Sequence, residues 1–166
     1  MSQVNLSFLR IGVGWDRHRL APGRPLLLGG IQIPGDHGLA GHSDADVLLH
    51  AVIDALLGAA GEDDIGTLFP DTDPAFRGAD SKKLTGEVLE LVHSRGFQIL
   101  SLDAVLAAER PKLAAYRPAI RASLASLLQA DPATVNFKAK TGEGVGLIGR
   151  GEVMEATVVA LLAKTS

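Results

Sequence analysis

The first forty residues alternate between apolar and polar positions in short runs, a spacing typical of strands. Residues 9–18 alternate loosely and predict a strand, in which side chains two apart face the same side. Residues 25–34 hold apolar runs on both sides of a Gly-Gly pair, which predicts a hairpin or a second strand with its turn at the glycines. Residues 35–38, Gly-Asp-His-Gly, read as a loop.

The spacing then changes to that of a helix, because apolar residues recur at helical intervals from Leu48 to Leu57. Ser43 resembles its N-cap, and Asp46, three residues later, resembles the acidic member of a capping box. Gly58 and Gly61 are predicted to end this helix.

The second half of the chain predicts a further alternation of helices and strands. Residues 62–80 are rich in Asp, Gly and Pro and predict a long loop of functional importance. Beyond it we predict a helix over 81–95, a strand over 97–109, a helix over about 114–128, a short strand over 135–140, a glycine-rich segment over 141–151 and a last strand over 153–162. The 97–109 strand is expected to be apolar on both faces, with Leu100, Leu102 and Leu106 on one and Phe97, Ile99 and Val105 on the other.

This order of elements predicts one α+β domain over residues 1–166, with residues 1–8 as a poorly ordered extension. The fold expected is a small two-layer sandwich of a mixed β-sheet with helices on one face. Because the other sheet face also carries apolar residues, we expect it to be covered by further copies of the chain.

Composition narrows the classes of function. A net charge of −3 gives no general attraction to nucleic acid or to an anionic membrane. The chain has no cysteine, so a metal site must use histidine and carboxylate ligands. The N-terminus lacks the features of a signal peptide, and no apolar run reaches the length of a membrane span, so a cytoplasmic location is expected.

The first candidate site combines Asp16 and His18, which share a side of the first strand, with His50 on the following helix. Three such ligands leave a fourth position open, as in catalytic zinc sites, although manganese or iron also accept them. Asp54, one turn after His50, is a candidate to fix its imidazole tautomer. The alternative is a pair of solvated strand-end residues beside an unrelated core histidine, with Asp54 an exposed helix acid.

Two further segments could hold phosphate groups. His42-Ser43 lies at the expected helix start, where backbone N–H groups favour an anion, although a plain capping motif is the preferred explanation of Ser43 taken alone. In the second segment, Lys140 could neutralise phosphate charge and Glu143 could hold a hard cation such as Mg²⁺, beside glycines whose backbone can approach phosphates. An ordinary glycine-rich turn is the alternative there.

Together these segments resemble the 2-C-methyl-D-erythritol 2,4-cyclodiphosphate synthase family of non-mevalonate isoprenoid biosynthesis. The resemblance rests on IGVGWDRH, AGHSDADVLLHAVIDALLGAAG, DIGTLFPDTDPAFRGADS, ERPKL, VNFKAKTGEGVG and GRGE, and covers nearly all of the chain from Arg10 to about Leu162. It implies a homotrimer of small α+β subunits with active sites shared at the subunit boundaries. It also implies a metal-dependent cyclisation of 4-diphosphocytidyl-2-C-methyl-D-erythritol 2-phosphate that releases CMP.

The resemblance implies a role for each matching residue. Asp16, His18 and His50 would bind one Zn²⁺ per subunit, and Glu143 would bind Mg²⁺ or Mn²⁺ between the substrate phosphates. His42 and Thr141 would stabilise the transition state. The remaining implied substrate contacts are Ser43, Asp64, Ile65, Gly66, Phe69, Pro70, Asp71, Thr72 and Asp73 toward the phosphates and erythritol, Ala108, Glu109, Arg110, Pro111, Lys112, Leu113 and Ala114 toward the cytidine, Lys140 and Gly142 beside Thr141, and Leu147 and Arg150 near a cavity on the threefold axis.

Four positions depart from the family pattern. Trp15 stands where Phe is usual, Arg17 places a charge between two ligands, Gly142 stands where Thr or Asn is commoner, and Leu147 replaces a frequent Phe. Two other classes of function compete with a cyclase: a zinc hydrolase that activates water, and a non-catalytic nucleotide- or metal-binding module. A hydrolase requires a general base near the metal, for which Asp46 is the candidate.

Overall fold

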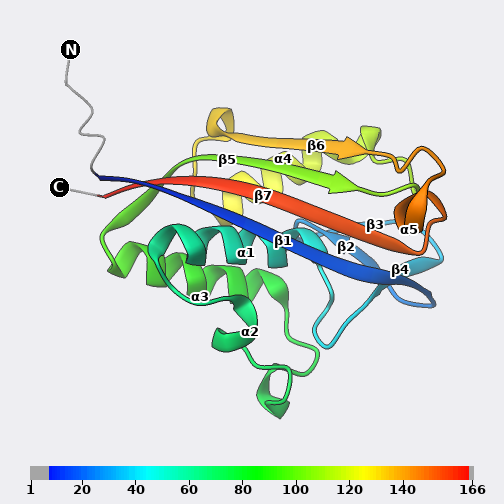
Figure 1. Cartoon of the computed structure of the whole chain (residues 1–166), viewed down its shortest axis with the longest axis horizontal. Coiled ribbons are helices and arrows are strands. Elements are labelled where there is room, and N and C mark those ends of the chain that lie inside the picture. The colour runs from blue at the N-terminus through cyan, green and yellow to red at the C-terminus, as the bar shows by residue number, and fades with distance from the viewer. Residues whose placement is uncertain (1–7, 165–166) are drawn as a thin grey trace.

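A five-stranded mixed sheet in the order β4-β1-β7-β5-β6 forms one layer of the molecule (Figure 1). The computed structural model describes residues 8–164, so the N-terminal extension expected over 1–8 lies, apart from Phe8, outside the described residues. The strands of this sheet are β1 (Leu9–Pro22), β4 (His37–Ala40), β5 (Phe97–Ala107), β6 (Val135–Lys140) and β7 (Val153–Lys164). β5 and β6 are parallel and the other neighbours are antiparallel, which confirms the predicted mixed sheet of an α+β fold.

The helices form the second layer. They are α1 (Val47–Ala60), α2 (Ile65–Leu68), α3 (Ser81–Ser94), α4 (Arg117–Leu127) and α5 (Gly146–Gly149), with short 3₁₀ turns η2 (Pro74–Phe76), η3 (Ala114–Tyr116) and η4 (Pro132–Thr134). In Figure 1, α1 and α3 lie on the same side of the sheet, and the core forms between them and the strands. Within residues 8–164, no helix combines the length and apolar character needed to cross a lipid bilayer.

The opposite face of the sheet carries apolar side chains that are open to solvent in the single chain. Ile11 is 69% exposed, Val13 64% and Trp15 51%, all on β1, and Val159 on the neighbouring β7 is 37% exposed. Large apolar residues at consecutive outward positions of adjacent strands form a contiguous patch, a feature typical of interaction surfaces.

Three local predictions were wrong. The helix begins at Val47 with Asp46 as its N-cap, not at Ser43, because the Asp46 carboxylate itself accepts a hydrogen bond from the N–H of Leu49 at 3.0 Å. Part of the expected 35–38 loop belongs to β4, because Gly38 and its neighbours pair with the end of β1. The 62–80 loop contains α2 and η2, each capped by an aspartate side chain.

The side-chain alternation of β5 was also assigned wrongly, because a β-bulge interrupts the strand. Its pairing with β7 shifts between Ile99 and Ser101, so one extra residue reverses the alternation. Phe97 and Ile99 therefore pack against the same core as Leu102, although the sequence pattern placed them on opposite faces.

Two glycines allow α1 to lie unusually close to β1. A Cβ atom on Gly14 would stand 1.8 Å from the carbonyl oxygen of Ala51, and one on Gly12 would stand 2.0 Å from that of Ala55. The helix residues at this contact are alanines, so backbone packs almost directly on backbone. This contact brings the end of β1 and the first turns of α1 together.

A buried carboxylate joins the start of α1 to the hairpin of β2 (Leu26–Leu28) and β3 (Ile31–Ile33). Asp46 is fully buried and accepts hydrogen bonds from the turn N–H groups of Gly29 at 2.9 Å and Gly30 at 2.7 Å. Both turn residues have positive φ, 62° and 80°, as two-residue hairpin turns require. The predicted hairpin is thus present, and its turn is held against the helix that carries His50.

Candidate metal centre and substrate pockets

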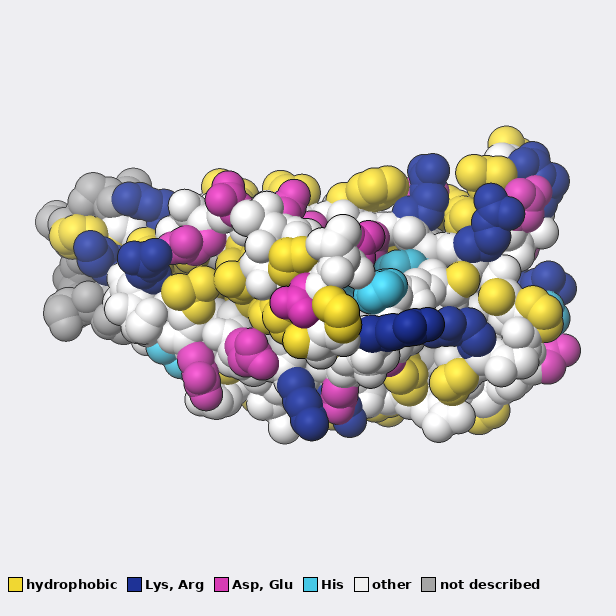
Figure 2. Space-filling model, turned by 90° about the horizontal axis from the view of Figure 1, so that it is seen from below, with side chains coloured by type: hydrophobic (Ala, Val, Ile, Leu, Met, Phe, Trp, Pro, Cys, Tyr) yellow, Lys and Arg dark blue, Asp and Glu magenta, His cyan; other side chains and the backbone are white. Residues whose placement is uncertain are grey.

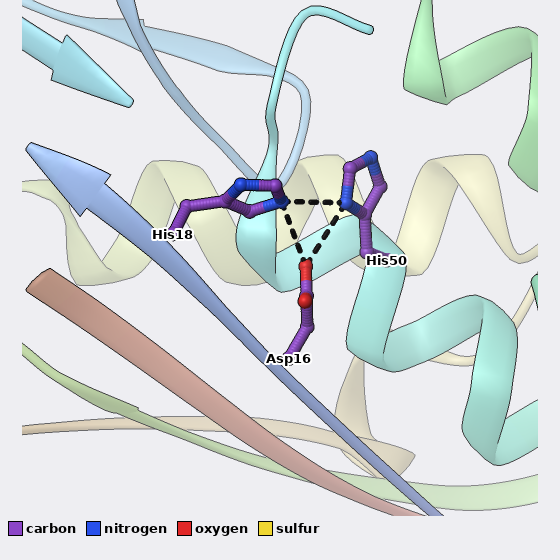
Figure 3. Close-up of side chains that lie close together, drawn as sticks. All are labelled: Asp16, His18 and His50. Atoms are coloured by element: carbon purple, nitrogen blue, oxygen red, sulfur yellow. Dashed lines mark hydrogen bonds and ion pairs between the residues drawn. The ribbon is translucent and has the colours of Figure 1, made fainter. Parts of the chain in front are cut away.

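Asp16, His18 and His50 bring three potential metal-ligand atoms together (Figure 3). Asp16 and His18 project from the same side of β1, and His50 projects toward them from α1. Nε2 of His18 lies 2.9 Å from Oδ2 of Asp16 and 3.0 Å from Nδ1 of His50, and the His50 nitrogen lies 3.0 Å from the same carboxylate oxygen. The close packing of α1 on β1 produces this convergence of residues 34 positions apart.

Hydrogen bonds outside the triad orient its members. Nδ1 of His18 lies 2.7 Å from the carbonyl oxygen of Ala40, which can only accept, so Nδ1 carries the proton and the Nε2 lone pair faces the centre. The other carboxylate oxygen of Asp16 accepts from the N–H of Arg17 at 2.8 Å. On the far ring nitrogen of His50, the neighbours are the hydroxyl oxygens of Ser43 at 3.1 Å and Ser81 at 3.0 Å.

The triad shifts the pKa values of two of its members. Burial raises the pKa of the Asp16 carboxyl, but the hydrogen bonds from His18 and His50 more than offset this and hold it well below its usual range. Burial lowers the pKa of His18, but the hydrogen bond and charge of Asp16 raise it above the usual histidine value. Both shifts favour an ionised Asp16 carboxylate, whose negative charge attracts a cation.

The donor set fits a zinc ion. Two imidazole nitrogens and one carboxylate oxygen are borderline and hard ligands of the kind that zinc accepts, and no thiolate is required. Ligand atoms at zinc bond lengths of about 2.0–2.2 Å and tetrahedral angles lie roughly 3.3–3.6 Å apart, somewhat more than the 2.9–3.0 Å between these atoms. When each histidine carries its proton on the outer, hydrogen-bonded nitrogen, three acceptor atoms face one another, and a proton or a metal ion is the natural partner for them.

The two histidines of the triad, His18 and His50, line a pocket of about 360 Å³. Its lining residues are His18, His42, Ser43, His50, Ile65, Gly66, Phe69, Asp71, Phe76 and Leu84. Figure 2, seen from the side on which α2 lies in Figure 1, shows histidine side chains at the surface near the middle of this face. Eight residues expected to bind metal, phosphate or erythritol therefore share this pocket, and Phe76 and Leu84 are two that sequence reasoning missed.

The segment from α2 to η2 forms the outer part of this pocket. Asp64 caps α2 by accepting from the N–H of Thr67 at 2.9 Å, and Asp73 caps η2 by accepting from the N–H of Ala75 at 2.9 Å. Pro70, Asp71 and Thr72 connect the two turns. The expected substrate residues of this segment thus include two aspartates already used to shape the backbone.

Asp54 does not have the expected role of orienting His50. Its carboxylate accepts a hydrogen bond from the N–H of Ile65 at 2.8 Å, which ties the start of α2 to α1. Half-burial raises the Asp54 pKa, and the backbone hydrogen bond opposes this rise. The wrong assignment arose because i, i+4 spacing fixes the face of a helix but not the neighbour that lies over it.

His42 and Ser43 lie at the pocket but not at a helix start, which corrects the expected anion site. His42 lies four positions before Asp46, the true N-cap, whose own carboxylate occupies the helix N-terminus. Ser43 instead accepts from the N–H of Ala45 at 3.1 Å and contacts His50. Any phosphate in this pocket would be met by side chains rather than by the helix dipole.

A second pocket, of about 190 Å³, lies beyond the parallel strands β5 and β6. Its lining residues are Ala108, Pro111, Lys112, Leu113, Ala114, Arg117, Ala139, Lys140 and Thr141. Most of the 108–114 segment, expected at the cytidine, therefore shares one hollow with Lys140 and Thr141, expected at the reacting phosphates, and sequence reasoning missed Arg117 and Ala139. Arg110 lines a neighbouring hollow with residues 34–37. Within residues 8–164, this pocket and the one beside the metal triad have no lining residue in common.

The glycine-rich segment is tightly folded beside this second pocket. The hydroxyl of Thr141 donates to Glu143, and the N–H of Gly142 donates to Glu109 at 3.0 Å. A Cβ on Gly142 would stand 2.4 Å from the backbone nitrogen of Gly149, so this chain has no space for the side chain common in the family.

Leu147 and Arg150, expected near a threefold axis, lie farther along the same segment. Leu147 is on α5 and is 39% exposed. Arg150 follows α5 and pairs through Nε with Glu152 at 2.5 Å, so its charge is partly engaged within the subunit.

Comparisons with known proteins identify relatives over nearly the whole chain. Residues 9–163 match the YgbB family. A 2-C-methyl-D-erythritol 2,4-cyclodiphosphate synthase of Bordetella petrii is 54% identical over 163 residues, 98% of this chain and 100% of that protein. A solved structure of such a synthase in a CDP-bound form superposes with a TM-score of 0.85 at 44% identity, covering 92% of this chain and 99% of the other.

A fused relative shows the same fold as part of a longer protein. The bifunctional IspDF of Campylobacter jejuni superposes with a TM-score of 0.92 at 40% identity and covers 95% of this chain. This chain corresponds to 43% of that protein.

Proposed function

Because the chain belongs to the YgbB family and is a phosphorus–oxygen lyase of the cyclodiphosphate synthase type, we propose that it performs a metal-dependent cyclisation in a homotrimer. The substrate proposed is 4-diphosphocytidyl-2-C-methyl-D-erythritol 2-phosphate. An oxygen of its 2-phosphate bonds to the β-phosphorus, and the bond from that phosphorus to the CMP oxygen breaks. The products are 2-C-methyl-D-erythritol 2,4-cyclodiphosphate and CMP.

The observation that carries this proposal is the convergence of Asp16, His18 and His50, two of which, His18 and His50, line a pocket that also contains His42. A cation held by this triad would place positive charge where two phosphate groups must approach each other against their mutual repulsion. A zinc ion bound there, and a magnesium or manganese ion held by Glu143, would supply neutralisation of phosphate oxygens.

The side chains of this chain have positioning and charge-stabilising roles in the proposed reaction. The nucleophile is already an anionic phosphate and the leaving group is a nucleotide phosphate, so neither a strong base nor a strong acid is required. A ring N–H of His42 can donate a hydrogen bond to a phosphate oxygen. The Thr141 hydroxyl can do the same if it gives up its present hydrogen bond to Glu143. Holding the 2-phosphate in line with the β-phosphorus makes the reaction intramolecular, which supplies much of the rate.

Two separate hollows support a site completed by a second subunit. The pocket beside the metal triad carries the proposed erythritol and phosphate contacts, and the pocket after β5 and β6 carries the proposed cytidine contacts. The CDP-bound relative supports a cytidine nucleotide as the ligand class. The exposed apolar face around Val13 and Trp15 is the surface that subunits would bury against one another.

The position of Asp46 argues against a zinc hydrolase. This carboxylate is fully buried and accepts three backbone hydrogen bonds, so it cannot take a proton from water at the triad. A non-catalytic binding module does not explain why His42 lines the same pocket as the metal-site histidines His18 and His50.

The test is to run the reaction in ¹⁸O-labelled water with Mg²⁺. We expect CMP and a cyclic diphosphate, both free of label, because the attacking oxygen belongs to the substrate. His42→Ala and Thr141→Ala should slow CMP release without introducing label, whereas His93→Ala, an exposed histidine at the end of α3, should leave the rate unchanged. Label in CMP or in an open erythritol phosphate would show that water attacks, and the hydrolase would replace the cyclase.

A further inference from the structure

A chain of hydrogen bonds leads away from the metal triad through Ser81, the first residue of α3. Nε2 of His50 lies 3.0 Å from Oγ of Ser81, and this hydroxyl lies 2.5 Å from Oδ1 of Asp44. The N–H of Ser81 donates to the other oxygen of the same carboxylate at 3.0 Å. Ser81 is fully buried, so its hydroxyl is shielded from bulk solvent.

The direction of each bond follows from the atoms involved. A carboxylate has oxygens that accept and no hydrogen to donate, so the single hydrogen of the Ser81 hydroxyl lies toward Asp44. Toward His50 the same oxygen can then only accept. Nε2 of His50 must therefore carry the proton, which leaves the lone pair of Nδ1 facing Asp16 and His18.

We propose that Ser81 and Asp44 are positioning residues that fix the tautomer and orientation of His50 for metal binding. This inference rests on the proposed zinc site at the triad. In this proposal the carboxylate that orients His50 is Asp44, acting through the buried Ser81 hydroxyl, and not Asp54 as the sequence predicted. Asp44 and Ser81 thereby have a role although neither contacts the reacting groups in the proposed reaction. Such outer partners of metal-bound histidines raise metal affinity by holding the ring in place.

The surroundings of Asp44 hold it rigidly in this role. Its own N–H donates to the carbonyl oxygen of Ala79 at 3.1 Å, which ties the loop before α1 to the loop before α3. The N–H of Asp46 approaches Oδ1 of Asp44 at 3.3 Å. His50 is thus held in position by the start of α3 as well as by α1, the helix to which it belongs.

Ser43 determines how large the effect should be. Its hydroxyl oxygen also lies 3.1 Å from Nε2 of His50, so the ring keeps one partner when the Ser81 hydroxyl is removed. We therefore expect Ser81→Ala to weaken metal binding without abolishing it, by about 10–100-fold in zinc dissociation constant.

The test measures zinc affinity by competition with a chromophoric chelator, using the full chain stripped of metal. Ser81→Ala and Asp44→Asn should each bind zinc about 10–100-fold more weakly than wild type. Thr85→Val is the matched control, because it removes another fully buried hydroxyl of α3, one that donates to the Ser81 carbonyl oxygen at 2.7 Å and not to His50. It should bind zinc within about twofold of wild type, a difference below about 0.5 kcal/mol.

A second readout separates positioning from general loosening of the fold. In zinc-loaded protein with ¹⁵N-labelled histidine, the Nε2–H signal of His50 should be protected from solvent exchange in wild type and in Thr85→Val. It should exchange faster in Ser81→Ala. In the Ser81→Ala background, adding Asp44→Asn should change zinc affinity by less than about twofold, because both act through one chain of bonds.

The outcomes distinguish this inference from the function on which it rests. Wild-type protein that binds no zinc would overturn the metal site and the positioning role together. Wild type that binds zinc, with Ser81→Ala equal to it or with the effects of Ser81→Ala and Asp44→Asn fully additive, would overturn the positioning role alone. If Ser81→Ala does not fold, the zinc affinity of Asp44→Asn compared with that of Thr85→Val tests the positioning role in the same way.

Discussion

Replacing Gly14 by alanine should push α1 away from β1 and damage the metal site from a distance. The added Cβ would lie 1.8 Å from the carbonyl oxygen of Ala51, whereas ordinary contact begins at 3.4 Å. The shortfall is 3.4 − 1.8 = 1.6 Å, and both partners are backbone, so no side chain can rotate away. The helix itself must move by an appreciable part of that distance.

Such a movement has two separate costs. Overpacking against backbone should lower the free energy of unfolding by about 3 kcal/mol, the upper end of the usual range. For a chain of this size, that corresponds to a fall in melting temperature of roughly 6–12 °C. It should also draw His50 away from Asp16 and His18, whose ligand atoms now lie within 3.0 Å of its own, and weaken zinc binding.

The assay pairs chemical denaturation of metal-free protein with zinc competition. Gly86→Ala is the control, because the same change within α3 meets nothing within 4 Å and should stabilise the protein by about 0.5–1 kcal/mol. We therefore expect Gly14→Ala to lower the free energy of unfolding and Gly86→Ala to raise it. A Gly14→Ala protein with wild-type stability and zinc affinity would refute the idea that this contact sets the position of His50.

Three other predictions concern a buried carboxylate, a titration and the assembly. Asp46→Asn should lower the free energy of unfolding by about 1–3 kcal/mol by denaturant titration, because an amide oxygen cannot serve all three N–H groups that the carboxylate now accepts; an unchanged midpoint would contradict this. Zinc affinity should fall as pH is lowered, because a protonated His18 cannot bind metal. Since Asp16 raises the pKa of His18, the fall should begin at a higher pH than for an ordinary histidine. Competition titrations between pH 5 and 8, a range around the ordinary histidine pKa, check this. Light scattering should show a trimer for wild type and for Glu87→Lys, a change at an exposed position of α3, but a smaller species for Val13→Lys on the apolar sheet face. A monomeric wild type would exclude the shared active site.

Much of this fold was predictable because its local signals agree with its packing. The two-residue Gly-Gly turn, the alternation of β1 and the helical spacing of α3 each correspond to an element in the structure. The triad was predictable for the same reason, since strand periodicity places Asp16 and His18 on one side and the helix that follows carries His50.

The failures came from interactions between segments distant in sequence. The bulge at Ile99–Ser101 depends on pairing with β7, and the N-cap at Asp46 depends on the hairpin turn that its carboxylate also binds. Nothing local to Ser81 indicates that it will face His50, because 31 residues and the whole 62–80 segment separate them.

The central pairing of β1 with β7 has a consequence for how the protein is made. Leu9 pairs with Ala163 and Arg19 with Val153, so the middle of the sheet joins the two ends of the chain. A ribosome releases β1 before β7, and until β7 emerges the described neighbours of β1 are the short β4 and α1. Contacts of such long sequence separation form slowly, and a central strand that lacks one partner and exposes Ile11 and Val13 is prone to wrong partners in the meantime. The sheet is therefore expected to be completed only after β7 has been synthesised, and a nascent chain stalled before residue 153 should be a substrate for chaperones rather than a partly working enzyme.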